Sequence, residues 1–218
     1  MRLSRYGGNP NIGVYSAANE NLAILPPNAS EEYIRDVEDT LRVVSVLTTV
    51  AGSTVVGSLV AMNSGCAVIS GLAEETEIGM ISDKIPVFVL HSRYNAAGNN
   101  ILANDHGAIV NPNIDDRNFK MIEKALGVRC VRSMIAGMDT VGSACKATNK
   151  GAVCHPLTSA PEMELIEGTL NVEVRKTTLN HGSGLLGPCL LANSKGAVVG
   201  DLTTPIEMGK LEDALNLF

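Results

Sequence analysis

The sequence contains no tryptophan and few other aromatic residues, which make up only 3% of its 218 residues. Hydrophobic residues nevertheless account for 45% of the chain, so the core has to be built from alanine, valine, isoleucine and leucine. Side chains of this size suit many short, closely spaced elements, and a chain of this length can bury a substantial core.

Long apolar runs and runs of like charge are missing as well. No apolar run approaches the roughly 20 residues that a membrane span needs, and the N-terminal stretch MRLSRYGGNPNIG lacks the apolar segment of a signal peptide. We therefore expect no contact with a membrane. The formal net charge is −6, which argues against a protein that wraps DNA or RNA by neutralising phosphates.

Spacings typical of metal or cofactor sites are also absent. The five cysteines form no CxxC pair, so we expect buried, reduced thiols in a cytosolic protein. The four histidines show no spacing that would hold zinc. The stretch GSTVVGS has the glycine spacing of a phosphate loop but not its essential lysine. We expect neither a metal nor a cofactor.

What the sequence does contain is a repeat. ILANDHGAIV (101–110) and LLANSKGAVV (190–199) are nearly the same, and their asparagine anchors five copies spaced by 44, 41, 45 and 44 residues. A glycine lies six residues before the anchor, except in the fourth copy, which has Ser143 there with Gly142 beside it. The anchors are Asn19, Asn63, Asn104, Asn149 and Asn193.

Each copy also contains a helical pattern. Fifteen residues after the anchor, or fourteen in the fourth copy, an apolar triplet begins with spacing i, i+3, i+7, as in Ile34, Val37 and Leu41. This spacing predicts one buried stripe of a helix of two to three turns. Acidic residues or serine precede several triplets, and such residues favour the N-terminus of a helix. Two residues beyond each triplet, a β-branched residue or leucine opens a strand-like run.

The unit therefore reads as strand, tight turn at the asparagine, strand, helix and strand. We interpret the asparagines as turn residues that tolerate positive φ. A unit of about 44 residues cannot bury its apolar face alone, so the units must pack on one another. The fifth copy stops at Phe218 before its last strand, and we expect Arg2 to Tyr6 to supply that strand and to close a ring. No linker is visible, so we expect one domain over residues 1–218.

Five such repeats resemble the pentein fold, a five-bladed α/β propeller with pseudo-fivefold symmetry. Within it, the chain is similar to the archaeal branch of the translation initiation factor 6 family. The resemblance covers nearly the whole chain and rests on NIGVYSAANE, GSTVVGSLVAMNSGCAVI, GNNILANDHGAIVNP, TVGSACKATNKGAVCHP and LLANSKGAVVGDLTTPIEMGKLEDAL. It implies a ribosome anti-association factor. Such a factor binds the large subunit on its intersubunit face, chiefly through ribosomal proteins beside the sarcin–ricin loop, and blocks joining of the small subunit.

The resemblance also implies where the ribosome would bind. In the family, the loops before the first strand of each repeat meet the ribosome, and glycine there lets a partner approach the backbone closely. The alternative is that these glycines only make turns. The residues that this assigns to ribosome binding are Gly13, Gly57, Ser58, Gly98, Asn99, Gly142, Ser143 and Gly187.

The stretch HSRYNAAGNN (91–100) is the most polar loop of the chain. Arg93 and Tyr94 are of types enriched at interface hot spots, so we add both to the ribosome-binding residues; the alternative is a solvated surface loop. Because the net charge is −6, contact with basic ribosomal proteins fits better than contact with RNA phosphates. We expect a monomer.

A hypothesis from another class is a pentein enzyme that modifies guanidino groups. It would use Cys189 as nucleophile with His155 or His181 as base. Against it, Cys189 lies where a strand should run, no carboxylate pair accompanies the thiols, and the loops are short. We therefore expect no enzyme. A pentein scaffold with a different protein partner remains open, because a fold does not determine function.

Overall fold

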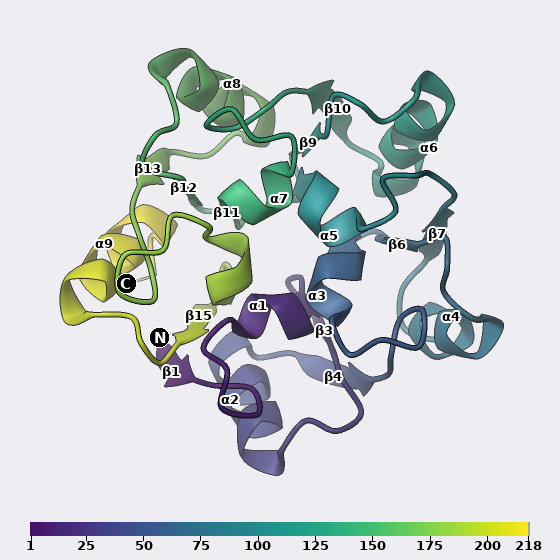
Figure 1. The fold of residues 1–218 in the computed structure, drawn as a ribbon, viewed down its shortest axis with the longest axis horizontal. Helices are drawn as coiled ribbons and strands as arrows, with labels where there is room; N and C mark the ends of the chain where they lie inside the picture. Colours follow the sequence, from purple (N-terminus) through teal and green to yellow (C-terminus); the bar gives the residue numbers. More distant parts are fainter. Residues whose placement is uncertain (218) are drawn as a thin grey trace.

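The computed structural model describes residues 1–217, which form five α/β units around a common axis (Figure 1). Phe218, where the sequence predicts that the fifth copy stops, lies outside the described residues. Each unit has a short inner helix, an antiparallel strand pair, an outer helix and a third strand. This is the predicted order with one difference, since a helical turn stands where the sequence suggested only a glycine-containing turn before the first strand.

Within residues 1–217 the strands form five separate three-stranded sheets. The first three sheets are β2 (Ala17–Ala18), β3 (Leu22–Leu25) and β4 (Val44–Leu47); β5 (Val60–Met62), β6 (Ala67–Ser70) and β7 (Val87–Leu90); and β8 (Ile101–Ala103), β9 (Gly107–Val110) and β10 (Arg129–Arg132). The other two are β11 (Cys145–Ala147), β12 (Ala152–Cys154) and β13 (Val174–Lys176); and β14 (Leu190–Asn193), β15 (Gly196–Gly200) and β1 (Arg2–Ser4).

The N-terminal strand completes the fifth sheet, as the sequence predicts. β1 pairs in parallel with β15, with Leu3 opposite Val199. It is shorter than expected, because Tyr6 leaves the sheet and forms an isolated bridge with Asn9. In every sheet the first two strands are antiparallel and the third is parallel to the second, which requires a crossover connection. The outer helix supplies that crossover, and none of the five sheets closes on itself.

The outer helices lie at the periphery, and the inner helices surround the axis (Figure 1). The outer set is α2 (Glu31–Leu41), α4 (Glu75–Ser82), α6 (Asp116–Leu126), α8 (Ala160–Leu170) and α9 (Pro205–Leu215). The inner set is α1 (Ile12–Tyr15), α3 (Val56–Leu59), α5 (Ala97–Asn100), α7 (Val141–Ala144) and the 3₁₀ helix η1 (Gly187–Cys189). None of the helices within residues 1–217 combines the length and apolar character that a membrane crossing requires.

The predicted apolar triplets fall on the outer helices. Their second and third members are buried, as in α2, where Val37 and Leu41 are fully buried. The acidic first turns act as caps: in α9 the Thr204 hydroxyl accepts from the Glu207 amide, and the Glu207 carboxylate accepts from the Thr204 amide. α4 ends at Ser82, so the last member of its triplet, Ile85, is buried beyond the helix rather than in it.

The core consists of clusters shared between neighbouring units. One cluster joins Ile24 of the first unit to Ile69 and Ile81 of the second. Another joins Val37 of the first unit to Val198 of the fifth. No unit buries its apolar face alone, which is the packing that the repeat predicted.

The anchor asparagines connect the units as well as shaping the turns. In Asn104 the side-chain oxygen accepts from the His106 and Gly107 amides at 2.9 and 3.0 Å. Its amide group donates to the carbonyls of Thr148 and Leu170 in the next unit at 3.0 and 2.8 Å. Asn193 makes the same bonds to the first unit, through Asn19 and Leu41. The interpretation of these residues as turn formers alone was therefore incomplete.

The anchor predicted for the fourth copy was wrong by one residue. There the turn is closed by Thr148, whose hydroxyl accepts from the Lys150 and Gly151 amides at 3.1 and 3.3 Å. Asn149 instead exchanges hydrogen bonds with Asp105. With Thr148 as anchor, Gly142 lies six residues before it and Met163 fifteen after it, so the fourth copy becomes regular.

Candidate docking face

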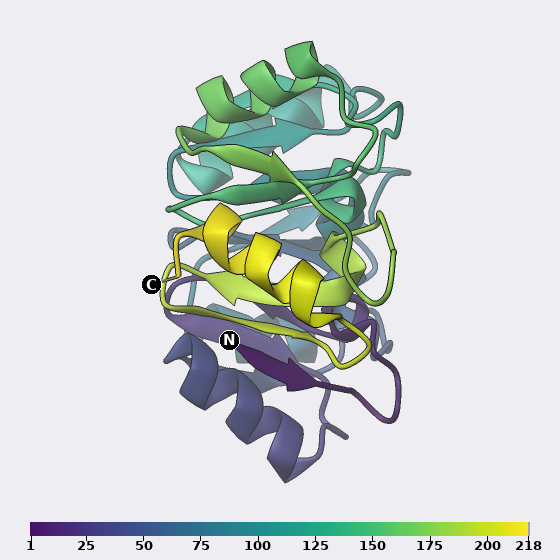
Figure 2. The same ribbon diagram turned by 90° about the vertical axis from the view of Figure 1, so that its left-hand side faces the viewer.

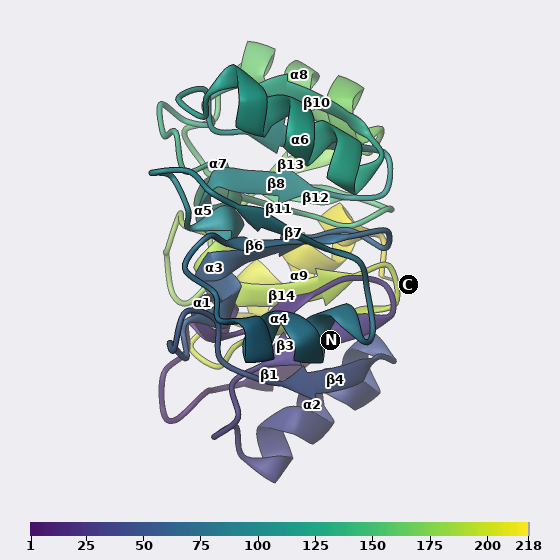
Figure 3. The same ribbon diagram turned by 90° about the vertical axis from the view of Figure 1, so that its right-hand side faces the viewer.

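The units present two unlike ends. The inner helices and the loops that precede them lie at one end, and the asparagine turns lie at the other; Figure 3 shows α1, α3, α5 and α7 at the left-hand end. Seen from the opposite side, the same loops project to the right (Figure 2). We call the first end, with the loops 5–11, 48–55, 91–96, 133–140 and 177–186, the loop face.

The five predicted glycines lie where the inner helices contact one another. A Cβ added to Gly57 would lie 2.0 Å from the carbonyl oxygen of Gly13, and one on Gly98 would lie 1.9 Å from that of Gly57. The series continues through Gly142 and Gly187 to Gly13, so the first and fifth units also meet. Only glycine allows this backbone approach. The close contact is thus made by the neighbouring unit, and a docking role for these glycines stays a prediction.

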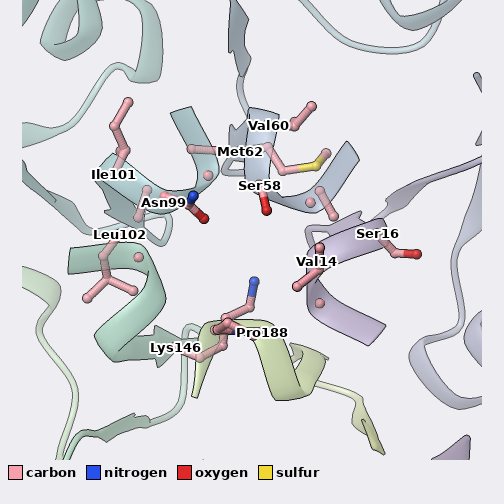
Figure 4. Close-up of a pocket in the computed structure, with 18 of the residues that line it drawn as sticks. Val14, Ser16, Ser58, Val60, Met62, Asn99, Ile101, Leu102, Lys146 and Pro188 are labelled. Atoms are coloured by element: carbon pink, nitrogen blue, oxygen red, sulfur yellow. The ribbon is translucent and has the colours of Figure 1, made fainter. Parts of the chain in front are cut away.

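Residues of the inner helices and of the first strands surround a cavity on the axis. Its volume is about 50 Å³, and Ser58, Asn99 and Lys146 point into it (Figure 4). Val14 and Pro188 line it from the first and fifth units. Of the predicted binding residues, Ser58 and Asn99 are therefore brought together. Ser143 is half-buried on α7.

The loop 91–96 differs from the other four loops of this face. Each of those forms a tight hairpin with an isolated bridge, and none is found at 91–96 within the described residues. The guanidinium of exposed Arg93 lies 4.7 Å from the centre of the Tyr94 ring and donates to the Tyr94 hydroxyl at 2.6 Å. The loop thus presents a planar cation that is held by an aromatic ring, and the ring itself packs against a core cluster.

Two buried asparagines support this loop, a role that no pattern in the sequence indicates. The Asn100 side chain donates to the carbonyl oxygens of Tyr94 and Ala96 at 3.3 and 2.9 Å. Asn111 in turn donates to the Asn100 side-chain oxygen at 2.7 Å. The base of the loop is thereby fixed while Arg93 stays exposed.

Two other loops are held by buried glutamates, whose role the sequence does not indicate either. Glu207 accepts from the Gly182 amide at 2.8 Å and from the Thr178 hydroxyl at 2.7 Å. Burial opposes its ionisation, but these bonds and those from Thr204 outweigh burial and lower the pKa of Glu207 to about 2. Glu77 holds the loop 48–55 in the same way.

Exposed leucines recur nine residues after the turn anchor, in the segment that joins the second strand of a unit to its outer helix. Leu72, Leu157 and Leu202 are 68%, 77% and 57% exposed. The first and third units have Asn28 and Asn113 there. Single exposed leucines are common on protein surfaces. Three at equivalent positions place apolar area at the loop ends of the second, fourth and fifth units.

The thiols are chemically unsuited to nucleophilic attack. All five cysteines are free and buried. Burial raises the pKa of the Cys189 thiol, with smaller opposing contributions from Ser183 and Asn180. It raises the pKa of Cys130 to about 12. Nucleophilic cysteines need the opposite shift, and the Cys189 thiol is directed to the Leu185 carbonyl oxygen at 3.1 Å.

These features define an α/β protein of five equivalent units whose loops are fixed on one face. Comparison with known proteins identifies its family. The model described as the eIF-6 family matches residues 1–214. The chain belongs to this family.

Proteins called translation initiation factor 6 are similar to the chain over most of its length. The factor from Methanosphaerula palustris is 41% identical over 191 residues, which cover 88% of this chain and 86% of that protein. The factor from Methanoculleus marisnigri is 42% identical over 184 residues, or 84% of each chain. The factor from Thermoplasma acidophilum is 37% identical over 180 residues, or 83% of each chain.

Proposed function

We propose that the protein is a translation initiation factor that binds the large ribosomal subunit on its intersubunit face and sterically prevents the small subunit from joining. Membership of the eIF-6 family supports the role in initiation. The observation that supports docking through the loop face is the 91–96 loop, where exposed Arg93 is paired with half-buried Tyr94 on a base fixed by Asn100.

The proposed contact surface extends from this loop across the inner helices. On the inner helices the half-buried side chains of Ser58, Asn99 and Ser143 supply polar groups, and the exposed leucines supply apolar area at the edge. Protein–protein contacts typically combine apolar and polar area, as this surface does. With a net charge of −6, the protein is suited to basic ribosomal proteins, and we propose those beside the sarcin–ricin loop as its partners.

Occlusion requires a rigid body and no turnover. The inter-unit cores, the glycine contacts and the glutamate-held loops all restrain the loop face. We propose one domain of five repeats over residues 1–218, a pentein ring completed by the N-terminal strand. It would act as a cytoplasmic monomer without a cofactor. The raised thiol pKa values support a protein that is not an enzyme.

Sedimentation with separated ribosomal subunits tests the proposal. We expect the protein to migrate with the large subunit alone and to suppress subunit joining. Arg93→Ala and Tyr94→Ala should weaken both effects, whereas Arg35→Ala, a matched exposed arginine on outer helix α2, should not. Protein that stays at the top of the gradient while joining proceeds would refute the proposal.

The enzyme hypothesis has its own test. Cys189→Ala should leave subunit binding and anti-association unchanged, because the thiol is buried against the Leu185 carbonyl. Loss of function in a folded Cys189→Ala protein, or turnover of a guanidino substrate by the unmodified protein, would favour the enzyme instead.

A further inference from the structure

Lys146 occupies a position of the repeat that is otherwise apolar. It lies in β11, two residues before the turn anchor Thr148. The residues at this position in the other units are Ala17, Ala61, Leu102 and Leu191. Packing of the five units therefore does not call for a charged side chain here.

The Lys146 side chain enters the axial cavity and meets no counter-charge there. It makes no ion pair with any of residues 1–217. The carboxylates on the axis, Glu20 and Asp105, lie at the asparagine-turn end, where they accept hydrogen bonds from Ser194 and Ser64. Lys146 is half-buried, so its ammonium loses part of its hydration, and a partner of opposite charge would replace what is lost.

Further donors converge on the same cavity. The Ser58 hydroxyl and the Asn99 amide point into it from the inner helices α3 and α5, facing Lys146 across the axis (Figure 4). The remaining walls include Val14, Met62 and Leu102, which offer no side-chain donor or charge. A cavity of about 50 Å³ has room for a few waters or one small ion.

We propose that the axial cavity is a binding site for one small inorganic anion, no larger than phosphate, held by the Lys146 ammonium with Ser58 and Asn99 as further hydrogen-bond donors. The anion neutralises a charge that the protein itself leaves unpaired. Burial lowers the pKa of Lys146, and a bound anion acts in the opposite direction by stabilising the ammonium form. This proposal concerns the isolated protein and does not depend on ribosome binding.

Lysine-selective NMR of the full chain tests the site. The ¹³Cε signal of Lys146 is followed while sodium phosphate or sodium chloride is added, with ionic strength held constant by sodium HEPES, whose anion as a whole is much larger than phosphate. We expect the Lys146 signal to shift and saturate at one anion per chain. The signal of Lys150, exposed on the adjoining turn, should not saturate. If only phosphate saturates the signal, the site is specific for a tetrahedral oxyanion. If chloride saturates it as well, the site accepts small anions in general. Both outcomes support the proposal.

Equilibrium dialysis with labelled phosphate and chloride compares anion binding by two matched variants. Lys150→Met should keep the single site, and Lys146→Met should lose it. If Lys146→Met fails to fold, Lys146→Leu replaces it, because leucine already fills this position as Leu102 and Leu191. No saturable binding of either anion to the unmodified protein, or undiminished binding to a folded Lys146 variant, would overturn the proposal.

Discussion

Replacing Asn104 separates the two roles of a turn anchor, which are to close its own turn and to bind the next unit. Thr148 serves as the control, because its side chain closes a turn without binding the next unit. Asn104 is buried and makes four side-chain hydrogen bonds, two within its turn and two to the next unit. Thr148, the anchor of the following unit, keeps the two turn bonds through its hydroxyl. Asn104→Ala should thus lose all four bonds, and Asn104→Thr only the two that join units.

The expected magnitudes follow from the number of bonds lost. A hydrogen bond contributes about 1 kcal/mol net to stability, and more when its loss leaves a buried partner unsatisfied. We expect Asn104→Ala to lower the free energy of unfolding by about 4 kcal/mol and Asn104→Thr by about 2 kcal/mol. The reciprocal change, Thr148→Asn, adds a donor toward the fifth unit and should raise stability by about 1 kcal/mol.

Equilibrium unfolding in guanidinium chloride, followed by circular dichroism, measures these differences. Equal losses for Asn104→Ala and Asn104→Thr would show that the inter-unit bonds contribute nothing. A loss below about 1 kcal/mol for Asn104→Ala would refute the turn contribution as well.

Three further outcomes are expected from the isolated protein. In thermal unfolding, Gly98→Ala should destabilise the folded protein by about 3 kcal/mol or more, since the new Cβ would lie 1.9 Å from the Gly57 carbonyl oxygen. The control Gly79→Ala, which has open space around it, should stabilise the protein by about 0.5–1 kcal/mol. The pKa of Glu207 is lowered to about 2 in the folded state. Its contribution to folding stability is therefore complete above its pKa in the unfolded chain, near 4.5, and is lost as pH falls toward 2. Glu207→Gln should remove that part of the pH dependence in acid titrations, and an unchanged profile would contradict it. Ellman's reagent should react with Cys189 only as fast as the protein unfolds, and fast reaction of the native protein would disprove burial.

The strands and outer helices that the units share could be predicted from the sequence, because each of these patterns recurs from copy to copy. The stripe of Val37 and Leu41, the strand pair around Asn104 and the missing strand of the fifth unit all follow from comparing copies. Even the misplaced fourth anchor was detectable. Thr148 satisfies both the glycine and the triplet spacing, but threonine is a less familiar turn residue than the neighbouring Asn149. The role of the glycines was not detectable, since a backbone contact between units leaves no mark in any single copy.

The candidate sites lie where one unit differs from the other four. Packing of five like units favours similar residues at equivalent positions. A residue that differs from its equivalents is therefore not explained by packing and is a candidate for a functional role. Lys146 stands where the other units have alanine or leucine, and the loop 91–96 has no bridge where the other four have one. The sequence alone marked the second departure by its polar residues. It did not mark the first, because one lysine in a strand does not reveal that its side chain enters a cavity formed by all five units. In a repeat protein a residue that differs from its equivalents is therefore informative only together with its place in the structure, and that combination indicates where to look for function.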